Sequence, residues 1–200
     1  MDQVAYRTSI VDNGYAIVPS VLSTEEVRAM RSALESLLGE ARLDPSWRAG
    51  GTLHLGDLSP VGVFEPAWTS PKIRAVVEQL LGPQARVARA HFRAPQPGFG
   101  AQTLHADCPE PIMPGDERIA TAIVALVDFN EVNGATRLVP GSHKVPRLAL
   151  PANPEDRFPG QIAVRCAAGD AIVFSGHLRH SGTRNRSRER RDSLQISFLR

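Results

Sequence analysis

Two histidines and one aspartate are the residues of this chain best suited to bind a transition metal. His105 and Asp107 form a His-x-Asp pair, and His180 follows far along the chain. Two imidazoles and one carboxylate are the ligand set of mononuclear non-haem Fe(II) centres, which keep open coordination positions. An open face on the metal implies chemistry with a cosubstrate and O2 rather than a structural ion.

The positions of these residues agree with a shared ion. Residues i and i+2 of a strand face the same side, so His105 and Asp107 at the end of a strand can converge on one metal. The third ligand must come from a distant strand. His180 fits this role because it follows a predicted strand and lies at a turn with Gly182. His177 lies just before it and is a rival for the same role; otherwise it is expected to line the pocket.

Arg191 supplies what a dicarboxylate cosubstrate needs at its far end. It opens the final predicted strand, and its guanidinium can form a two-pronged pair with a carboxylate held near the metal. Ser193 lies on the same face by strand alternation and could add a hydroxyl donor, whereas Arg190 would face the other way. The remaining arginines of this region are expected to lie on a solvated, charged hairpin. A nucleic-acid surface is not favoured, because no aromatic residues that could stack on bases lie between the arginines.

A further strand carries candidates for contact with a substrate. His91 alternates with Arg89 and Arg93, so His91 and Arg93 would touch substrate if this face lines the interior. An anionic substrate would suit four of the arginines, although surface positions are expected for most of them. These four are Arg89, Arg93, Arg137 and Arg179.

The elements that must position these residues are two helices followed by many short strands. A capping box at Ser23 and Glu26 begins the first helix, which ends near Gly39. Ser70-Pro71 begins the second helix, and Gly82-Pro83 ends it. The predicted strands are 14–19, 87–92, 103–107, 119–129, 136–139, 161–164, 171–174 and 194–199. This order predicts a mainly β fold, an antiparallel sandwich or barrel with the helices outside.

One segment of this pattern is expected to be a loop. The stretch from Val145 to Gly160 contains four prolines and is predicted to be a surface excursion, with a possible role as a lid over the barrel mouth.

Composition narrows the class of protein. The 200 residues, 42% of them hydrophobic, fit a single domain spanning 1–200. No apolar run approaches the roughly 20 residues that a membrane-spanning helix needs, and no secretory signal is visible. The net charge of +2 does not favour nucleic acid as a partner. Cys108 and Cys166 are predicted to be buried thiols, which agrees with a cytoplasmic location.

Four blocks of the sequence, in order, resemble the phytanoyl-CoA dioxygenase family of Fe(II)/2-oxoglutarate-dependent oxygenases. The resemblance covers nearly the whole chain. It rests on residues 13–19 with 22–27 (NGYAIVP and LSTEEV), on 102–107 (QTLHAD), on 133–144 (NGATRLVPGSHK) and on 169–191, which contains GDAIVF and the histidine and arginine of the distal segment.

The resemblance implies a double-stranded β-helix, a cupin-like jelly-roll barrel with iron at its mouth. It places His105, Asp107 and His180 on the iron ligands and Arg191 on the distal carboxylate of 2-oxoglutarate. Gln102 falls where similar enzymes place an amide against the cosubstrate. The implied cofactor is Fe(II), with 2-oxoglutarate and O2 as cosubstrates. Related halogenases lack the carboxylate ligand, so Asp107 argues against halogenation.

The expected function is therefore oxidation, usually hydroxylation, of an unactivated C–H bond in a small molecule, with release of succinate and CO2, and a natural-product intermediate is the expected substrate. The alternatives are a barrel of the same fold that binds a metal or small ligand without turnover, a cupin-type enzyme that does not use 2-oxoglutarate, and a nucleic-acid demethylase. The sequence does not choose the substrate or the oligomeric state.

Overall fold

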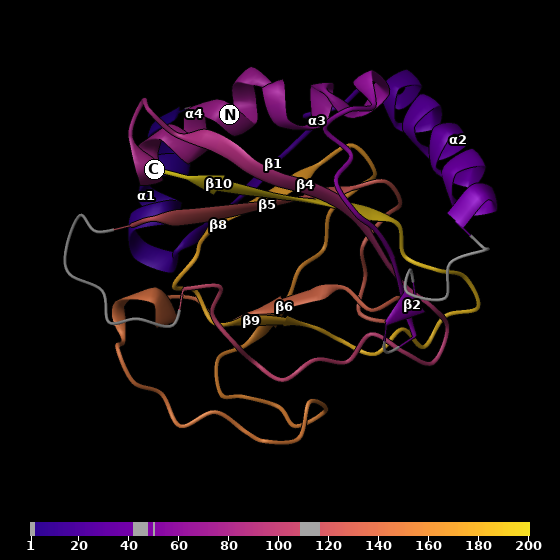
Figure 1. Cartoon of the computed structure of the whole chain (residues 1–200). Helices are drawn as coiled ribbons and strands as arrows, with labels where there is room; N and C mark the ends of the chain where they lie inside the picture. Colours follow the sequence, from indigo (N-terminus) through magenta and orange to yellow (C-terminus); the bar gives the residue numbers. More distant parts are fainter. Residues whose placement is uncertain (1–2, 42–47, 50, 109–116) are drawn as a thin grey trace.

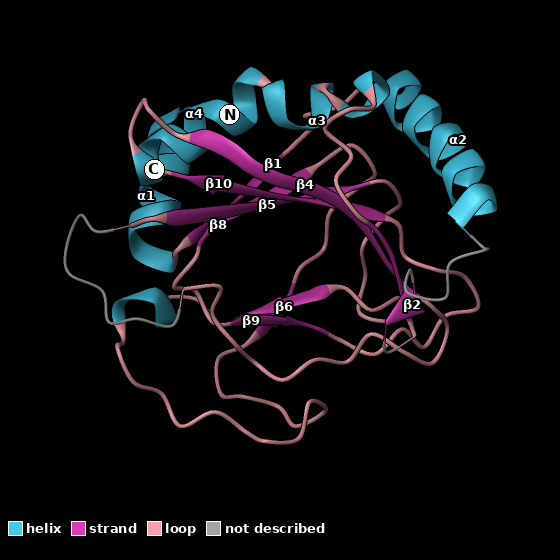
Figure 2. Cartoon of the chain, viewed as in Figure 1, coloured by secondary structure: helices cyan, strands magenta, loops and turns pink. Residues whose placement is uncertain are grey.

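Two antiparallel sheets face each other, and helices pack on the outer side of the larger sheet (Figure 1). The computed structural model describes residues 3–41, 48–49, 51–108 and 117–200. The larger sheet has the strand order β1-β8-β5-β10-β4-β3-β2, and the smaller has the order β7-β6-β9. This arrangement confirms the predicted mainly β, jelly-roll fold with flanking helices (Figure 2).

The elements have the following bounds. The α-helices are α1 (Gln3–Asn13), α2 (Thr24–Ala41), α3 (Pro66–Thr69) and α4 (Pro71–Leu81). The strands of the larger sheet are β1 (Tyr15–Val18), β2 (Arg48–Ala49), β3 (Thr52–Leu55), β4 (Arg86–Pro95), β5 (Ile119–Ala125), β8 (Ala171–Ser175) and β10 (Ser193–Leu199). Those of the smaller sheet are β6 (Thr136–Leu138), β7 (Ile162–Ala163) and β9 (His180–Gly182). Short 3-10 turns lie at Gly62–Phe64 and Ser142–Lys144.

The outer face of the larger sheet forms one hydrophobic core with the helices. Alternate residues of the central strands point outward to this core, as Phe92 of β4 and Ile196 of β10 do. Met30 of α2 and Val76 of α4 are fully buried against the same layer. Because the side chains alternate, the intervening residues of each strand must face the space between the two sheets.

The space between the sheets is divided into an apolar and a polar part. Phe174 and Ile172 of β8 pack there against Leu138 of β6, forming a second hydrophobic cluster. The corresponding positions of β10 and β4 are polar, as Ser193 and Arg93 show. The polar residues that could bind a ligand therefore lie at one side of the interior, next to the apolar cluster.

The predicted helices are largely confirmed. Ser23 and Glu26 form the capping box: the Ser23 amide donates to the Glu26 carboxylate at 2.7 Å, and the Glu26 amide donates to Ser23 Oγ at 3.2 Å. The helix continues past Gly39 to Ala41, since one glycine does not end a helix that keeps burying an apolar face. The first helix, α1, was not predicted, because its sequence has no acidic first turn.

The predicted strand Thr103–Asp107 is wrong. Only His105 forms an isolated antiparallel bridge, and its partner is His180. Strand β9 is three residues long and uses its other edge for β6, so it supports no longer ladder on this side. The predicted strand 119–129 also ends early, because after Ala125 the chain bends and only Phe129 returns to a bridge.

Arg137 of β6 fastens the proline-containing excursion to the smaller sheet. Its buried guanidinium donates to the backbone carbonyls of Asp156 at 2.7 Å and Pro154 at 2.9 Å. It also donates to Ser181 Oγ at 2.7 Å and to the Gln102 carbonyl at 3.2 Å. One side chain thus holds together β9, the 154–161 segment and the segment that leads to His105. The suggested role of this excursion as a lid stays a prediction.

Replacing Arg137 by Met should destabilise the protein by about 2–4 kcal/mol, because one buried and several partly buried acceptors lose a charged donor while the side-chain volume is largely kept. Urea unfolding measures this change. Arg165→Met is the matched control, since the Arg165 side chain is 72% exposed and pairs only with Glu131. Equal effects of the two substitutions would show that Arg137 is not an anchor.

Candidate metal centre

His105, Asp107 and His180 come together at one end of the interior. One potential ligand atom from each lies within 4.8 Å of the others. The two imidazole rings have centroids 4.5 Å apart, and His180 Nε2 lies 3.6 Å from Asp107 Oδ1. The bridge between His105 and His180 has two backbone hydrogen bonds of 2.9 and 3.0 Å, so the chain itself brings these ligands side by side. The donor set fits a mononuclear Fe(II) site.

Backbone carbonyls orient both histidines. His105 Nδ1 lies 2.9 Å from the Thr103 carbonyl, and His180 Nδ1 lies 2.9 Å from the Leu178 carbonyl. A carbonyl only accepts, so each Nδ1 carries the hydrogen and each Nε2 keeps its lone pair. This is the arrangement that holds metal-binding histidines in the required tautomer.

Thr121 of β5 orients the carboxylate. Its hydroxyl donates to Asp107 Oδ2 at 2.6 Å, which leaves Oδ1 facing His180. Thr121 is fully buried and belongs to the larger sheet, whereas His180 belongs to the smaller one. The three candidate ligands are therefore held from both sheets.

The electrostatics keep His180 neutral. Burial lowers its pKa, nearby His105 lowers it further, and Asp107 acts in the opposite direction. A neutral imidazole offers the lone pair that a metal needs at neutral pH.

Arg191 and the triad line the same cavity. The volume of this cavity is about 80 Å³. The residue is 6% exposed, and its guanidinium stacks on the Phe129 ring at 4.3 Å. Its Nε and Nη1 atoms are buried without a hydrogen-bond partner in the described part of the chain. Burial lowers the pKa of Arg191 to about 10, with Arg93 acting in the same direction, so it stays protonated at neutral pH. A buried cation with unsatisfied donors suits an anion.

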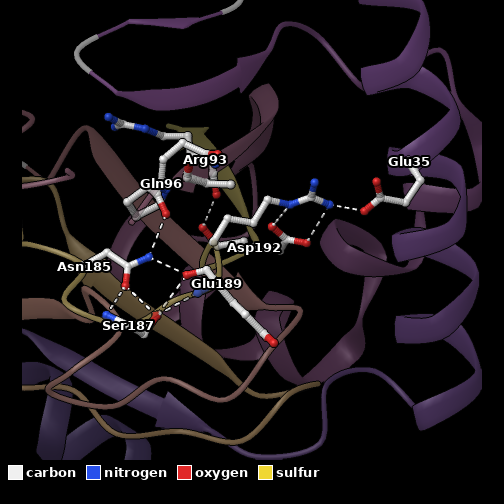
Figure 3. A network of polar contacts seen from close by, with 11 residues as sticks. Glu35, Arg93, Gln96, Asn185, Ser187, Glu189 and Asp192 are labelled. Carbon is white, nitrogen blue, oxygen red and sulfur yellow. Dashed lines mark hydrogen bonds and ion pairs between the residues drawn. The ribbon is translucent and has the colours of Figure 1, made fainter. Parts of the chain in front are cut away.

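Hydrogen bonds fasten the turn before β10 to the end of β4. Asn185 Nδ2 donates to the carbonyls of Pro95 at 3.0 Å and Glu189 at 2.7 Å (Figure 3). The Arg191 amide itself donates to the Pro95 carbonyl at 3.3 Å. Asn185 is fully buried, and its two hydrogen bonds connect the turn to the end of β4. They thereby fix the position of the backbone at Arg191.

Arg190 points the other way, as strand alternation predicts. It pairs with Asp192 and with Glu35 of α2, outside the barrel (Figure 3). This ion-pair group ties the start of β10 to the helix layer. Arg190 thus pairs with two carboxylates, whereas its neighbour Arg191 lines the cavity.

The two other residues predicted to contact a cosubstrate also line the cavity. Gln102 Oε1 accepts from the Gly182 amide at 3.1 Å, which leaves the side-chain amide to donate. Ser193 donates its hydroxyl hydrogen to the Arg93 carbonyl at 2.9 Å. Ser193 can therefore accept a hydrogen bond from a ligand, but the expected donor role conflicts with this geometry.

The three residues predicted for the substrate pocket are not grouped together. Arg93 lines the cavity with the triad. His91 is half-buried one step further along the same face of β4, opposite Gln195. His177 is 3% exposed and is not among the residues that line this cavity, and both its ring nitrogens lack partners among the described residues. The structure thus separates His177 from the triad.

Two residues around the site were not predicted from the sequence. Thr121 could have been suspected, because it is the polar residue within the apolar run 119–127. Phe129 carried no such signal, since an aromatic residue at the end of a strand is an ordinary core residue. Its stacking on Arg191 depends on the bend of the chain after Ala125.

Comparison with known proteins agrees with this geometry. A sequence model of the phytanoyl-CoA dioxygenase family matches residues 10–193. The chain belongs to this family. It is 27% identical over 207 residues to the dioxygenase olcK of Penicillium canescens, covering 93% of this chain and 67% of that protein. It is 37% identical over 111 residues to the dioxygenase trt7 of Aspergillus terreus, covering 52% and 37%.

Solved structures of similar fold include the epimerase SnoN in complex with Fe3+, alpha ketoglutarate and nogalamycin RO. The TM-score is 0.79 at 24% identity, over 98% of this chain and 83% of SnoN. HygX from Streptomyces hygroscopicus, with nickel, 2-oxoglutarate and hygromycin B bound, gives 0.77 at 21% identity, over 95% and 84%. These likenesses confirm the double-stranded β-helix.

Family membership, the dioxygenase relatives and the His-Asp-His group confirm the expected class of enzyme. The protein is an Fe(II)- and 2-oxoglutarate-dependent oxygenase of the phytanoyl-CoA dioxygenase family. No described helix is long and apolar enough to cross a membrane.

Replacing Thr121 by Val should weaken metal binding by about 10- to 100-fold, because the substitution keeps the shape but frees the Asp107 carboxylate to rotate. Competition with a fluorescent chelator for Co(II) measures the affinity. Thr121→Ser keeps the hydroxyl and should bind metal nearly as the wild type does. An unchanged affinity in Thr121→Val would mean that this hydrogen bond does not position the ligand.

Proposed function

We propose that His105, Asp107 and His180 hold Fe(II), and that Arg191 binds the distal carboxylate of 2-oxoglutarate. The protein would then oxidise a C–H bond of a small molecule, most simply by hydroxylation. In the net reaction, substrate, O2 and 2-oxoglutarate give hydroxylated substrate, succinate and CO2. One oxygen atom enters the alcohol, and the other enters succinate. Bound Fe(II) supplies the redox chemistry by which O2 is reduced.

The observation that carries the cosubstrate assignment is the state of Arg191. Its buried donors have no partner among the described residues, and it shares a cavity with the triad. A carboxylate would accept charge-assisted hydrogen bonds from the buried guanidinium and would offset the effect of burial on its charge. The Phe129 ring fixes the plane of the guanidinium before the ligand arrives.

The remaining polar groups would orient the cosubstrate. The amide of Gln102 can donate to it, while Ser193, whose hydrogen goes to the Arg93 carbonyl, would contact it through a bridging water. The apolar cluster beside the site, which includes Ile123 and Phe174, would exclude water from that side. The chain thus contributes binding and orientation.

We further propose a small-molecule substrate. SnoN and HygX, which share the fold, were crystallised with nogalamycin RO and hygromycin B, and both compounds are small molecules. That likeness supports the class of substrate but not its identity. An epimerase and a carbocyclase on the same fold indicate that the outcome at the C–H bond can differ between such enzymes.

A single domain over residues 1–200 and a cytoplasmic location are also part of the proposal. Cys108 and Cys166 are free thiols, which agrees with a reducing compartment. Burial raises the pKa of Cys166 to about 12, so this thiol is unreactive at neutral pH.

The proposal is tested by Fe(II)- and O2-dependent conversion of 2-oxoglutarate to succinate, which can proceed without the true substrate. We expect succinate from the wild type and none from His105→Ala. Arg191→Ala should raise the KM for 2-oxoglutarate roughly a hundredfold, equivalent to about 3 kcal/mol for an unpaired buried carboxylate. Arg188→Ala removes an exposed arginine nearby and should behave as the wild type does.

A second readout covers an enzyme that turns over only with its own substrate. Anaerobic addition of Fe(II) and 2-oxoglutarate should produce a visible metal-to-ligand charge-transfer band in the wild type and in Arg188→Ala. The band should be lost in His105→Ala. If neither succinate nor the band appears, the cosubstrate assignment is wrong. The better hypothesis is then a barrel protein that binds a metal or small ligand without turnover.

A further inference from the structure

Four basic side chains lie together on the inner side of β3 and β4. His54 belongs to β3, and Arg89, His91 and Arg93 belong to β4; we call them the basic cluster. The residues between them on β4, such as Phe92, are buried in the core beneath the helices. Alternation therefore turns the basic cluster toward the interior. Cross-strand pairing places His54 directly opposite Arg93.

The basic cluster continues the cavity of the metal centre. Arg93 lines that cavity, as does Gln195. Arg93 Nη1 donates a hydrogen bond to Gln195 Oε1 at 3.2 Å. The Arg93 side chain extends away from the Asn185 hydrogen-bond network, as Figure 3 shows. From Arg93 the cluster runs past half-buried His91 to exposed Arg89. The cluster thus extends from the cavity of the triad, at Arg93, to the surface, at Arg89.

Positive charge in this cluster is not neutralised by carboxylates. Within the described residues, neither Arg89 nor Arg93 forms an ion pair; Arg93 has only the neutral Gln195 as acceptor. Two acids act on these arginines electrostatically, Asp57 on Arg89 and Asp107 on Arg93. Arg93 is partly buried, and a partly buried guanidinium without a paired anion is unfavourable unless a ligand supplies one.

The histidines respond to the same field. The pKa of His91 is lowered to about 4, chiefly by burial and then by Arg89, Arg93 and His54. The pKa of His54 is lowered by burial and by both arginines. His91 Nδ1 is buried and has no hydrogen-bond partner among the described residues. Neutral imidazoles beside two guanidinium groups can each donate a hydrogen bond without adding charge.

The cosubstrate does not account for these charges. Fe(II), Asp107 and Arg191 together carry two positive charges, and the two carboxylates of 2-oxoglutarate neutralise them. The charges of Arg89 and Arg93 remain after that, with Asp57 as a partial offset. A further anion is therefore needed next to the metal centre, and the substrate is the molecule that must bind there.

We propose that the basic cluster binds an anionic group of the primary substrate, either a carboxylate or a phosphate or sulfate ester. This inference rests on the proposed function, because it uses the site of the primary substrate. Planar guanidinium groups suit such oxyanions through paired hydrogen bonds. Arg89 would meet the anion at the entrance, and Arg93 would hold it so that the rest of the molecule lies near the metal.

The test uses backbone amide NMR signals of β4 in the full chain, loaded with Zn(II) and 2-oxoglutarate so that Arg191 is occupied. Sulfate and acetate are titrated separately at constant ionic strength. We expect at least one of them to produce saturable shifts at residues 89–93 but not at Arg191. The tighter anion indicates whether the substrate group is an ester of phosphate or sulfate, or a carboxylate.

Two variants and a control define the outcome. Arg89→Gln and Arg93→Gln should each weaken anion binding about tenfold, the effect of roughly one charge-assisted hydrogen bond. Arg165→Gln makes the same charge change on an exposed side chain and should leave the affinity unchanged. Absence of saturation, or equal affinities in all three variants, would overturn the inference.

The charge-transfer band separates this failure from failure of the proposed function. A wild-type band without anion binding would reject only the basic cluster as a substrate site. Loss of the wild-type band would reject the cosubstrate assignment itself, whatever the anion titration shows.

Discussion

The pair of backbone hydrogen bonds between His105 and His180 is the interaction on which the site depends. These bonds join two segments that are far apart in sequence, and further hydrogen bonds flank them, from the Gln102 amide to the Gly182 carbonyl and from the Cys108 amide to the Gly176 carbonyl. They place both imidazoles on one side of the same bridge, so a single antiparallel contact sets the distance between two candidate ligands. The carbonyls that orient the rings belong to the same two segments, at Thr103 and Leu178.

Much of the structure could be predicted from local sequence. The capping box, the two amphipathic helices and most strands follow from patterns that act within a few residues, where hydrogen bonding and periodic burial decide the conformation. Residue types and spacing indicated the triad and Arg191, and the resemblance to the family assigned the same residues and supplied the barrel. The prediction that Arg190 and Arg191 face opposite sides is correct, although both residues precede β10 and do not belong to it.

The errors lie where tertiary contacts decide. The segment before Asp107 looked like a strand, but its partner β9 is too short to support a ladder. Ser193 was assigned as a donor, but the carbonyl of Arg93 on the neighbouring strand takes its hydrogen. Arg137 gave no sign of its role, since a buried arginine that binds only neutral acceptors depends on a loop whose path the sequence does not reveal.

The site is built from both sheets, and this has a mechanical consequence. His180 lies on the smaller sheet, whereas Asp107 is held by Thr121 of the larger sheet, and Arg191 lies just before β10 of the larger sheet. An ion bound to the triad would act as a crosslink between the two halves of the sandwich. The free energy of binding would then also oppose their separation, so occupancy of the centre and rigidity of the barrel should rise and fall together.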